Sequence, residues 1–179
     1  MRPRPARARP LFLVATVVVV MGLCCTFCAL PPRQTIRVPP RVLSLTDDAE
    51  VFDQAATARV NSALLDLKAR LAIDFAVLIV ASTAGVPIED YTREVYILWG
   101  MDEAVRSYSL RGAVLLVVAP EDNKWYVGYS DNLQRDLPRD LGLKLWEQAK
   151  GPAEAKLADR IETFVKLLSE QLVQTRGVP

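Results

Sequence analysis

The sequence predicts an α/β fold: a three-layer α/β/α sandwich built around a small mixed sheet. Residues 75–81 and 113–118 form two apolar runs, the kind of sequence typical of strands buried on both faces. The helical stretch between them indicates a right-handed parallel crossover. A turn cluster at residues 120–123 then predicts a hairpin and an antiparallel third strand. The predicted order is helix, strand, helix, strand, strand, helix, helix.

The first helix is expected to begin at Asp47 or Asp48, with the acid as its cap, and to end at Leu71. Its apolar residues have the spacing i, i+4, i+7, i+11, which predicts one face turned to the core. These residues are Val60, Leu64, Leu67 and Leu71. The first strand, residues 75–81, follows.

The second helix is predicted from Pro87, which suits a first-turn position, to Gly100, which ends it. One face of this helix is apolar and is expected to be buried; it carries Ile88, Tyr91, Val95 and Leu98. We predict a polar loop over residues 101–112, before the second strand.

Residues 124–129 alternate in the manner of a strand that returns from the hairpin turn. A further helix is predicted from near Pro138 to about Lys150, with a break at residues 151–152. The last helix is amphipathic, and its apolar face carries Leu157, Ile161, Phe164, Leu168 and Leu172.

The N-terminal leader predicts a membrane anchor. The segment that begins at Leu11 and ends at Leu30 has no charged residue, and about 20 apolar residues span a bilayer. We expect an uncleaved signal anchor, a single transmembrane helix in the cytoplasmic membrane with its N-terminus in the cytoplasm. A Pro-rich linker at residues 31–42, a periplasmic domain at 43–175 and a tail at 176–179 would follow. The alternative is a secreted or lipid-anchored domain, after cleavage of the leader or lipidation of one of its cysteines.

Composition excludes several kinds of site. The chain has no histidine, which removes Ser-His-Asp and Cys-His catalysis and His-ligated zinc. All three cysteines (Cys24, Cys25 and Cys28) lie in the leader, so the domain has no disulfide or thiol chemistry. Residues 42–179 hold 15 basic and 21 acidic residues, a net charge of −6. This acidic balance argues against a nucleic-acid partner.

The predicted topology brings carboxylates to one edge of the sheet. The loop that enters the second strand and the residues that leave the third should meet there, with Asp102, Glu103, Asp131 and Asp140 as candidate ligands. Such oxygen ligands suit Ca²⁺ or Mg²⁺. The alternative is that these are solvated loop acids and helix caps. No catalytic residue and no residue that binds an organic cofactor is identified.

Four stretches resemble the TPM domain family of bacterial envelope and thylakoid-lumen proteins. The specific parts are IEDYTREVYILWG at residues 88–100 and GAVLLVVAPEDNKWYVGY at 112–129. DDAEVF at 47–52 resembles the opening of the family pattern, and LPRD at 137–140 resembles the element that follows its third strand. The resemblance covers residues 43–173.

The resemblance implies an α/β/α fold, an extracytoplasmic setting and a membrane anchor. For some members it implies Ca²⁺ binding and acid phosphatase activity, and for others an accessory or assembly role in membrane complexes. This chain has Ser109-Leu110-Arg111-Gly112 where the family commonly has Lys-Asp-Asn-Gly, so Leu110 replaces an acid. Asp131 could substitute for that acid.

Three functional hypotheses follow. The first is a non-catalytic accessory, assembly or maintenance factor that binds a membrane or envelope protein complex. The second is a divalent-cation-dependent acid phosphatase with Asp102, Asp131 and Asp140 as cation ligands. The third is a cation-responsive switch without catalysis. The sequence leaves the partner, the substrate and the oligomeric state open.

Overall fold

The computed structural model describes residues 36–134, 137–138, 140–150 and 156–176. The predicted membrane segment from Leu11 to Leu30 and the predicted break at residues 151–152 lie outside these ranges. Among the helices of the described ranges, none combines the length and the apolar character that crossing a membrane requires.

A four-stranded mixed sheet forms the centre of the domain, with the strand order β1-β2-β3-β4. The strands are β1 (Leu45–Asp47), β2 (Ile73–Ile79), β3 (Gly112–Ala119) and β4 (Lys124–Tyr129). The first three run parallel, and β4 returns antiparallel to β3. Every residue of β2 and β3 is buried, because helices cover both faces of these central strands. The predicted α/β class and mixed sheet are confirmed.

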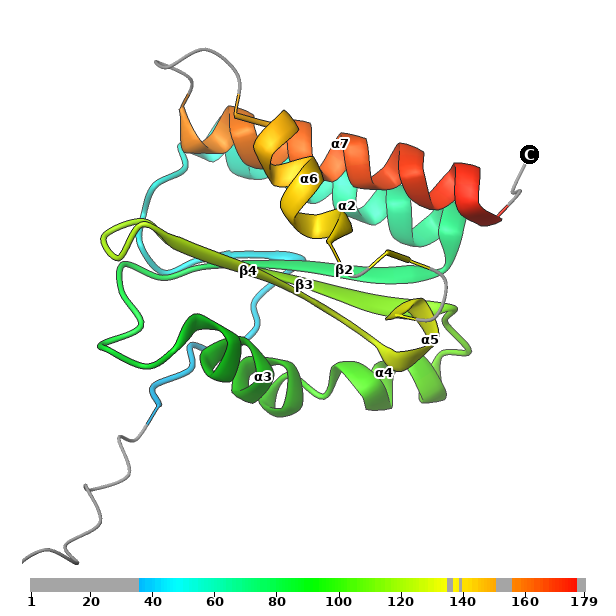
Figure 1. The fold of residues 1–179 in the computed structure, drawn as a ribbon, viewed down its shortest axis with the longest axis horizontal. Helices are drawn as coiled ribbons and strands as arrows, with labels where there is room; N and C mark the ends of the chain where they lie inside the picture. Colours follow the sequence, from blue (N-terminus) through cyan, green and yellow to red (C-terminus); the bar gives the residue numbers. More distant parts are fainter. Residues whose placement is uncertain (1–35, 135–136, 139, 151–155, 177–179) are drawn as a thin grey trace, which may run out of the picture. The chain divides into compact units, whose positions relative to one another are not determined.

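Helices lie on both sides of the sheet, as Figure 1 shows: α2, α6 and α7 on one side, α3 and α4 on the other. The six helices of the described ranges are α2 (Gln54–Leu71), α3 (Ile88–Leu98), α4 (Met101–Ser107), α5 (Asp131–Gln134), α6 (Leu141–Gln148) and α7 (Leu157–Arg176). Each face of the sheet has its own buried cluster. Val60, Leu64 and Phe164 belong to the first cluster, and Tyr91 and Met101 to the second.

The predicted start of the first helix is wrong. Residues 45–47 form β1, and α2 begins only at Gln54, after Asp53 as the N-cap. The Asp53 carboxylate accepts a hydrogen bond from Ala56 N–H at 2.7 Å. Asp47 instead stabilises the turn between β1 and α2, because its Oδ2 accepts the Phe52 N–H at 2.7 Å. An additional edge strand therefore precedes the predicted order.

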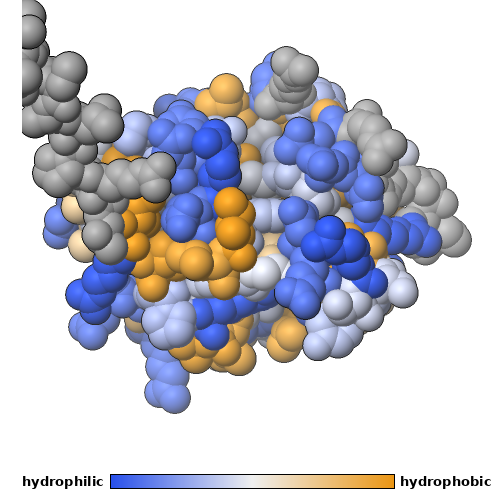
Figure 2. Space-filling model, turned by 90° about the horizontal axis from the view of Figure 1, so that it is seen from below, coloured by the Kyte–Doolittle hydropathy of each residue, from blue (hydrophilic) through white to orange (hydrophobic). Residues whose placement is uncertain are grey.

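The predicted loop at residues 101–112 is also wrong, because α4 occupies its first half. Gly100 has a φ of +60°, and this left-handed residue turns the chain from α3 into α4. Met101, with 0 % of its surface exposed, then takes the core position. Leu98, predicted to be buried, is 59 % exposed for this reason. Figure 2 views the face that carries α3 and α4, and it shows apolar residues gathered on part of that surface.

The segment before β1 packs against the domain as far back as Ile36. The Tyr91 hydroxyl donates to the Arg37 carbonyl at 2.9 Å, and Trp99 Nε1–H donates to the Pro39 carbonyl at 3.0 Å. Arg41 forms an ion pair with the buried Asp74 at 2.8 Å. Residues 36–42, predicted as part of a spacer, therefore contribute to the structure of the domain.

Candidate functional site

A groove of about 1220 Å³ runs along β4, the strand at one edge of the sheet. Its floor is the continuous stretch from Trp125 to Asp131. One wall comes from α3, with Tyr96 and Ile97 among its residues, and the other from α6 and the turn before it, with Leu143. β4 is an edge strand, so the space between these two walls lies open beside it.

The structure brings two of the four predicted ligands, Asp102 and Asp131, into this groove. The Tyr96 hydroxyl donates a hydrogen bond to Asp102 Oδ1 at 2.9 Å. Burial raises the pKa of Tyr96, and the hydrogen bond to Asp102, the charge of Asp102 and the charge of Asp131 raise it further. Tyr96 therefore stays a protonated donor between two negative charges.

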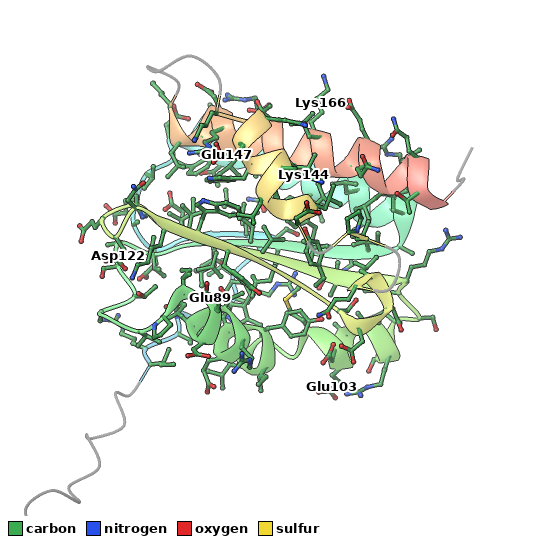
Figure 3. All side chains as sticks on the ribbon, viewed as in Figure 1. Glu89, Glu103, Asp122, Lys144, Glu147 and Lys166 are labelled. Carbon is green, nitrogen blue, oxygen red and sulfur yellow. The ribbon has the colours of Figure 1, made fainter. Side chains whose placement is uncertain are left out.

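The other two predicted ligands do not join them. Lys144 Nζ lies 2.7 Å from Asp140 Oδ2, and its hydrogen bond and charge hold the pKa of that carboxyl below its ordinary value. Glu103 projects from α4 on the side away from the sheet (Figure 3). Within the part of the chain that the structure describes, no three acidic, histidine or cysteine side chains are grouped so that they could hold a metal ion.

Asp131 owes its place to the end of β4. Ser130 N–H donates to the Ala113 carbonyl at 2.9 Å, and Ser130 Oγ accepts the Ala113 N–H at 3.0 Å. This pair of bonds continues the β3–β4 ladder to its last residue, and α5 begins directly at Asp131. The Ser130 side chain thus holds the end of the strand.

Sequence reasoning missed the apolar and aromatic residues of the groove. Ile97 is 63 % exposed, Leu143 is 59 % exposed and Tyr126 is 38 % exposed. Helical periodicity gave no reason to single out Ile97 or Leu143, because both lie off the buried faces. The signal for Tyr126 was the alternation of residues 124–129, which turns every second side chain of an edge strand to the same face.

Aromatic packing joins the floor of the groove to α6. Trp125 stacks on Trp146 of α6 with 4.9 Å between ring centroids, and Arg160 lies 4.1 Å above the Trp146 ring. Gly142 leaves room for Tyr129, since a Cβ at this position would lie 3.0 Å from the Tyr129 hydroxyl. Burial raises the pKa of Tyr129, so its hydroxyl stays protonated. The strand floor therefore packs closely against α6.

At the other end of β4, Asp122 has a structural role. It accepts hydrogen bonds from the Thr83 N–H at 2.8 Å and from the hydroxyls of Ser82 and Thr83. The Thr83 N–H first, and the Ser82 hydroxyl next, hold the pKa of Asp122 below its ordinary value. Asp122 lies at the hairpin turn, on the opposite side of the domain from α5 (Figure 3). Its bonds join this turn to the loop that follows β2.

Three solved structures with a similar fold illustrate the likeness. An N-terminal domain of a protein from P. gingivalis aligns with a TM-score of 0.62 and 22% identity, over 73% of this chain and 82% of that one. An N-terminal domain from Corynebacterium glutamicum aligns with a TM-score of 0.52 and 15% identity, over 77% of this chain and 87% of that one. The BA42 protein of Bizionia argentinensis aligns with a TM-score of 0.54 and 11% identity, over 73% of this chain and 90% of that one. At these identities the likeness shows the fold alone.

No curated protein matches the chain. The TPM domain family matches residues 45–153, which is more than half of the sequence and includes all four strands and the whole of α6. The chain therefore belongs to the TPM domain family.

Proposed function

We propose that this TPM domain protein is an accessory factor that binds a membrane or envelope protein complex and helps to assemble or maintain it. In this proposal the segment from Leu11 to Leu30 anchors the chain in the cytoplasmic membrane, and the domain acts on the periplasmic side. One observation carries the binding role: apolar and aromatic side chains are exposed along an open groove, at Ile97, Tyr126 and Leu143. Exposed apolar residues gathered on a concave surface are typical of interaction sites.

The charges along the groove fit a binding role better than hydrolysis. Only Asp102 and Asp131 of the predicted ligands line it, and Ca²⁺ requires about six to eight oxygen ligands. Asp140 is already paired with Lys144 in a salt bridge. Protein contacts need no such convergence, because they rest on buried apolar anchors with a polar rim.

Site-specific photo-crosslinking in intact cells that carry the full chain tests this role. A photoreactive amino acid replaces Leu143 in the groove or Leu65 on α2; these residues are 59% and 58% exposed. We expect the Leu143 position to give a discrete crosslink to another protein and the Leu65 position to give none. Equal crosslinking at both positions, or no crosslink at Leu143, would contradict the proposal.

A second candidate, a cation-dependent acid phosphatase, is supported by the placement of two carboxylates, Asp102 and Asp131, in the same groove. If these carboxylates bind Ca²⁺ or Mg²⁺, backbone carbonyls and water must supply the other ligands. Calorimetric titration of each ion into the full chain then gives heat, and Asp131→Asn weakens binding about tenfold or more. Absence of heat with both ions would remove this candidate and the cation-responsive switch together.

A further inference from the structure

The edge of β4 that lies away from β3 carries backbone groups that point out of the sheet. Because Ser130 N–H bonds the Ala113 carbonyl, the antiparallel alternation pairs Gly128 with Leu115 and Tyr126 with Val117 in the same way. The residues between them direct their N–H and C=O groups away from the sheet. These residues are Trp125, Val127 and Tyr129.

Within the described ranges, one of these outward groups is occupied: the Tyr129 carbonyl accepts a hydrogen bond from Gln134 Nε2 at 2.9 Å. No described residue bonds the outward groups of Trp125 or Val127. Exposed edge strands are usually protected by proline, inward-pointing charge or a covering element. β4 instead lies at the floor of an open groove and offers donors and acceptors at the spacing of a strand.

The two walls suit the alternating side chains of an added strand. Tyr126 faces the α3 side, as does Gly128, where a Cβ would contact Thr92 at 3.4 Å. Val127 faces the α6 side, where it contacts the Gly142 position. An extended segment paired with β4 would therefore place successive side chains against Ile97 and Tyr126 on one side and against Leu143 on the other.

The acidic residues of the groove favour basic residues at the ends of such a segment. Glu89, Asp102 and Asp131 line it, and Figure 3 shows Glu89 on the α3 side of β4. Among the described lining residues, Arg93 is basic, and its guanidinium is paired with Asp90 at 3.1 Å. The surface therefore favours lysine or arginine in its ligand and opposes a second copy of the same acidic surface.

We propose that the groove binds an extended segment of a partner protein as a fifth strand on β4. In this segment apolar residues alternate with other residues, and basic residues lie at its ends. Backbone hydrogen bonds to Trp125 and Val127 provide the pairing, and the apolar and acidic side chains of the groove provide the selectivity. This inference rests on the proposed accessory function and specifies how the partner is recognised.

Amide exchange followed by NMR on the full chain tests the free edge first. We expect the amides of Trp125 and Val127 to exchange fast and those of Tyr126 and Gly128 to exchange slowly. If the Val127 amide exchanges slowly, and more slowly as the protein concentration is raised, a second copy of the chain covers the edge. Slow exchange that does not depend on concentration would show that another part of the chain covers it. Either result overturns the proposal.

The probe is an acetylated and amidated peptide, KKVTVTVKK, added to the full chain. At about ten times its dissociation constant, we expect the exchange of the Trp125 and Val127 amides to slow about tenfold. The same peptide with N-methyl groups on alternate residues cannot form the ladder and should give no protection, and EEVTVTVEE should bind more weakly. If KKVTVTVKK gives no protection at about 1 mM, the weak end of peptide affinities, the proposal is wrong.

A matched pair of charge variants checks the site. We expect Glu89→Lys, in the groove, to weaken KKVTVTVKK binding about three- to fivefold, the size of one exposed charge contact. Glu103→Lys makes the same change of charge on α4 outside the groove and should leave binding unchanged. Equal effects would mean that the peptide binds by overall charge alone and would overturn the proposal. If the peptide fails while Leu143 still crosslinks to a protein, strand addition is wrong and the accessory function stands.

Discussion

Asp74, near the start of β2, is a buried acid with two cationic partners. Its carboxylate is 1% exposed and contacts Arg41 at 2.8 Å and Lys68 at 3.0 Å. Burial alone would raise the pKa of Asp74, but the hydrogen bonds and charges of Arg41 and then Lys68 outweigh it, and the pKa lies below the ordinary value of 3.8. Asp74 thus joins β2, the end of α2 and the segment before β1.

We predict that Asp74→Asn lowers the free energy of unfolding by about 2 kcal/mol at pH 7, because two cations lose their buried partner. The cost stays moderate since Arg41 and Lys68 remain 23% and 39% exposed to water. The depressed pKa makes the contribution complete above pH 3.8 and removes it as the pH falls through the folded-state value. Urea unfolding at pH 7 and in acid should show the difference between wild type and variant shrinking in acid.

Asp66→Asn is the control for this prediction. Asp66 also pairs with a cation, Arg70, at 2.8 Å, but both side chains are more than half exposed. Exposed pairs contribute little, so we expect a change of about 0.5 kcal/mol or less at either pH. A cost as large as that of Asp74→Asn would show that burial is not the cause.

At the scale of elements, the sequence predicts best what depends on long local patterns. β2 and β3 were predictable because their apolar runs are continuous, and β4 because a turn cluster precedes an alternating segment. α7 was predictable from its apolar face, which includes Ile161 and Leu168. In each case the buried residues themselves form the pattern.

The elements that the sequence did not predict are short. β1 has three residues, and its edge is completed by a side chain from another element: Asn61 Oδ1 on α2 accepts the Leu45 N–H at 2.9 Å. α4 has seven residues and depends on the left-handed turn at Gly100. Neither is long enough to be stable on its local pattern alone, so both form through tertiary contacts.

The candidate site was predictable in part for the same reason. Topology placed the loop before β3 and the end of β4 at one edge, which brings Asp102 and Asp131 into one groove. Topology did not reveal that Lys144, four residues after Asp140, pairs with that acid. It also did not reveal the groove walls, because Ile97 and Leu143 lie off the buried faces of their helices.

At the scale of the whole domain, the segment from Ile36 to Arg41 connects parts that are distant in sequence. It contacts α3 through Tyr91, the residue after α3 through Trp99, and β2 through Asp74. Ile36 and Val38 pack against the buried cluster on the α3 side of the sheet. A domain boundary at residue 43, which the sequence predicts from its prolines, would remove all of these contacts.

We therefore predict that a chain beginning at Leu43 unfolds with a free energy about 3 kcal/mol lower than a chain beginning at Ile36. The two lost hydrogen bonds contribute about 1 kcal/mol each, and the lost Arg41 partner and the lost apolar contacts of Ile36 and Val38 contribute the rest. Urea unfolding of both chains, each with and without Asp74→Asn, separates the contribution of the Arg41–Asp74 pair from the contributions of the other lost contacts. Asp74→Asn should cost less in the Leu43 chain, since Lys68 alone then remains beside Asp74, and the coupling should be about 1 kcal/mol. Equal stability of the two chains would mean that folding of the domain does not depend on residues 36–42.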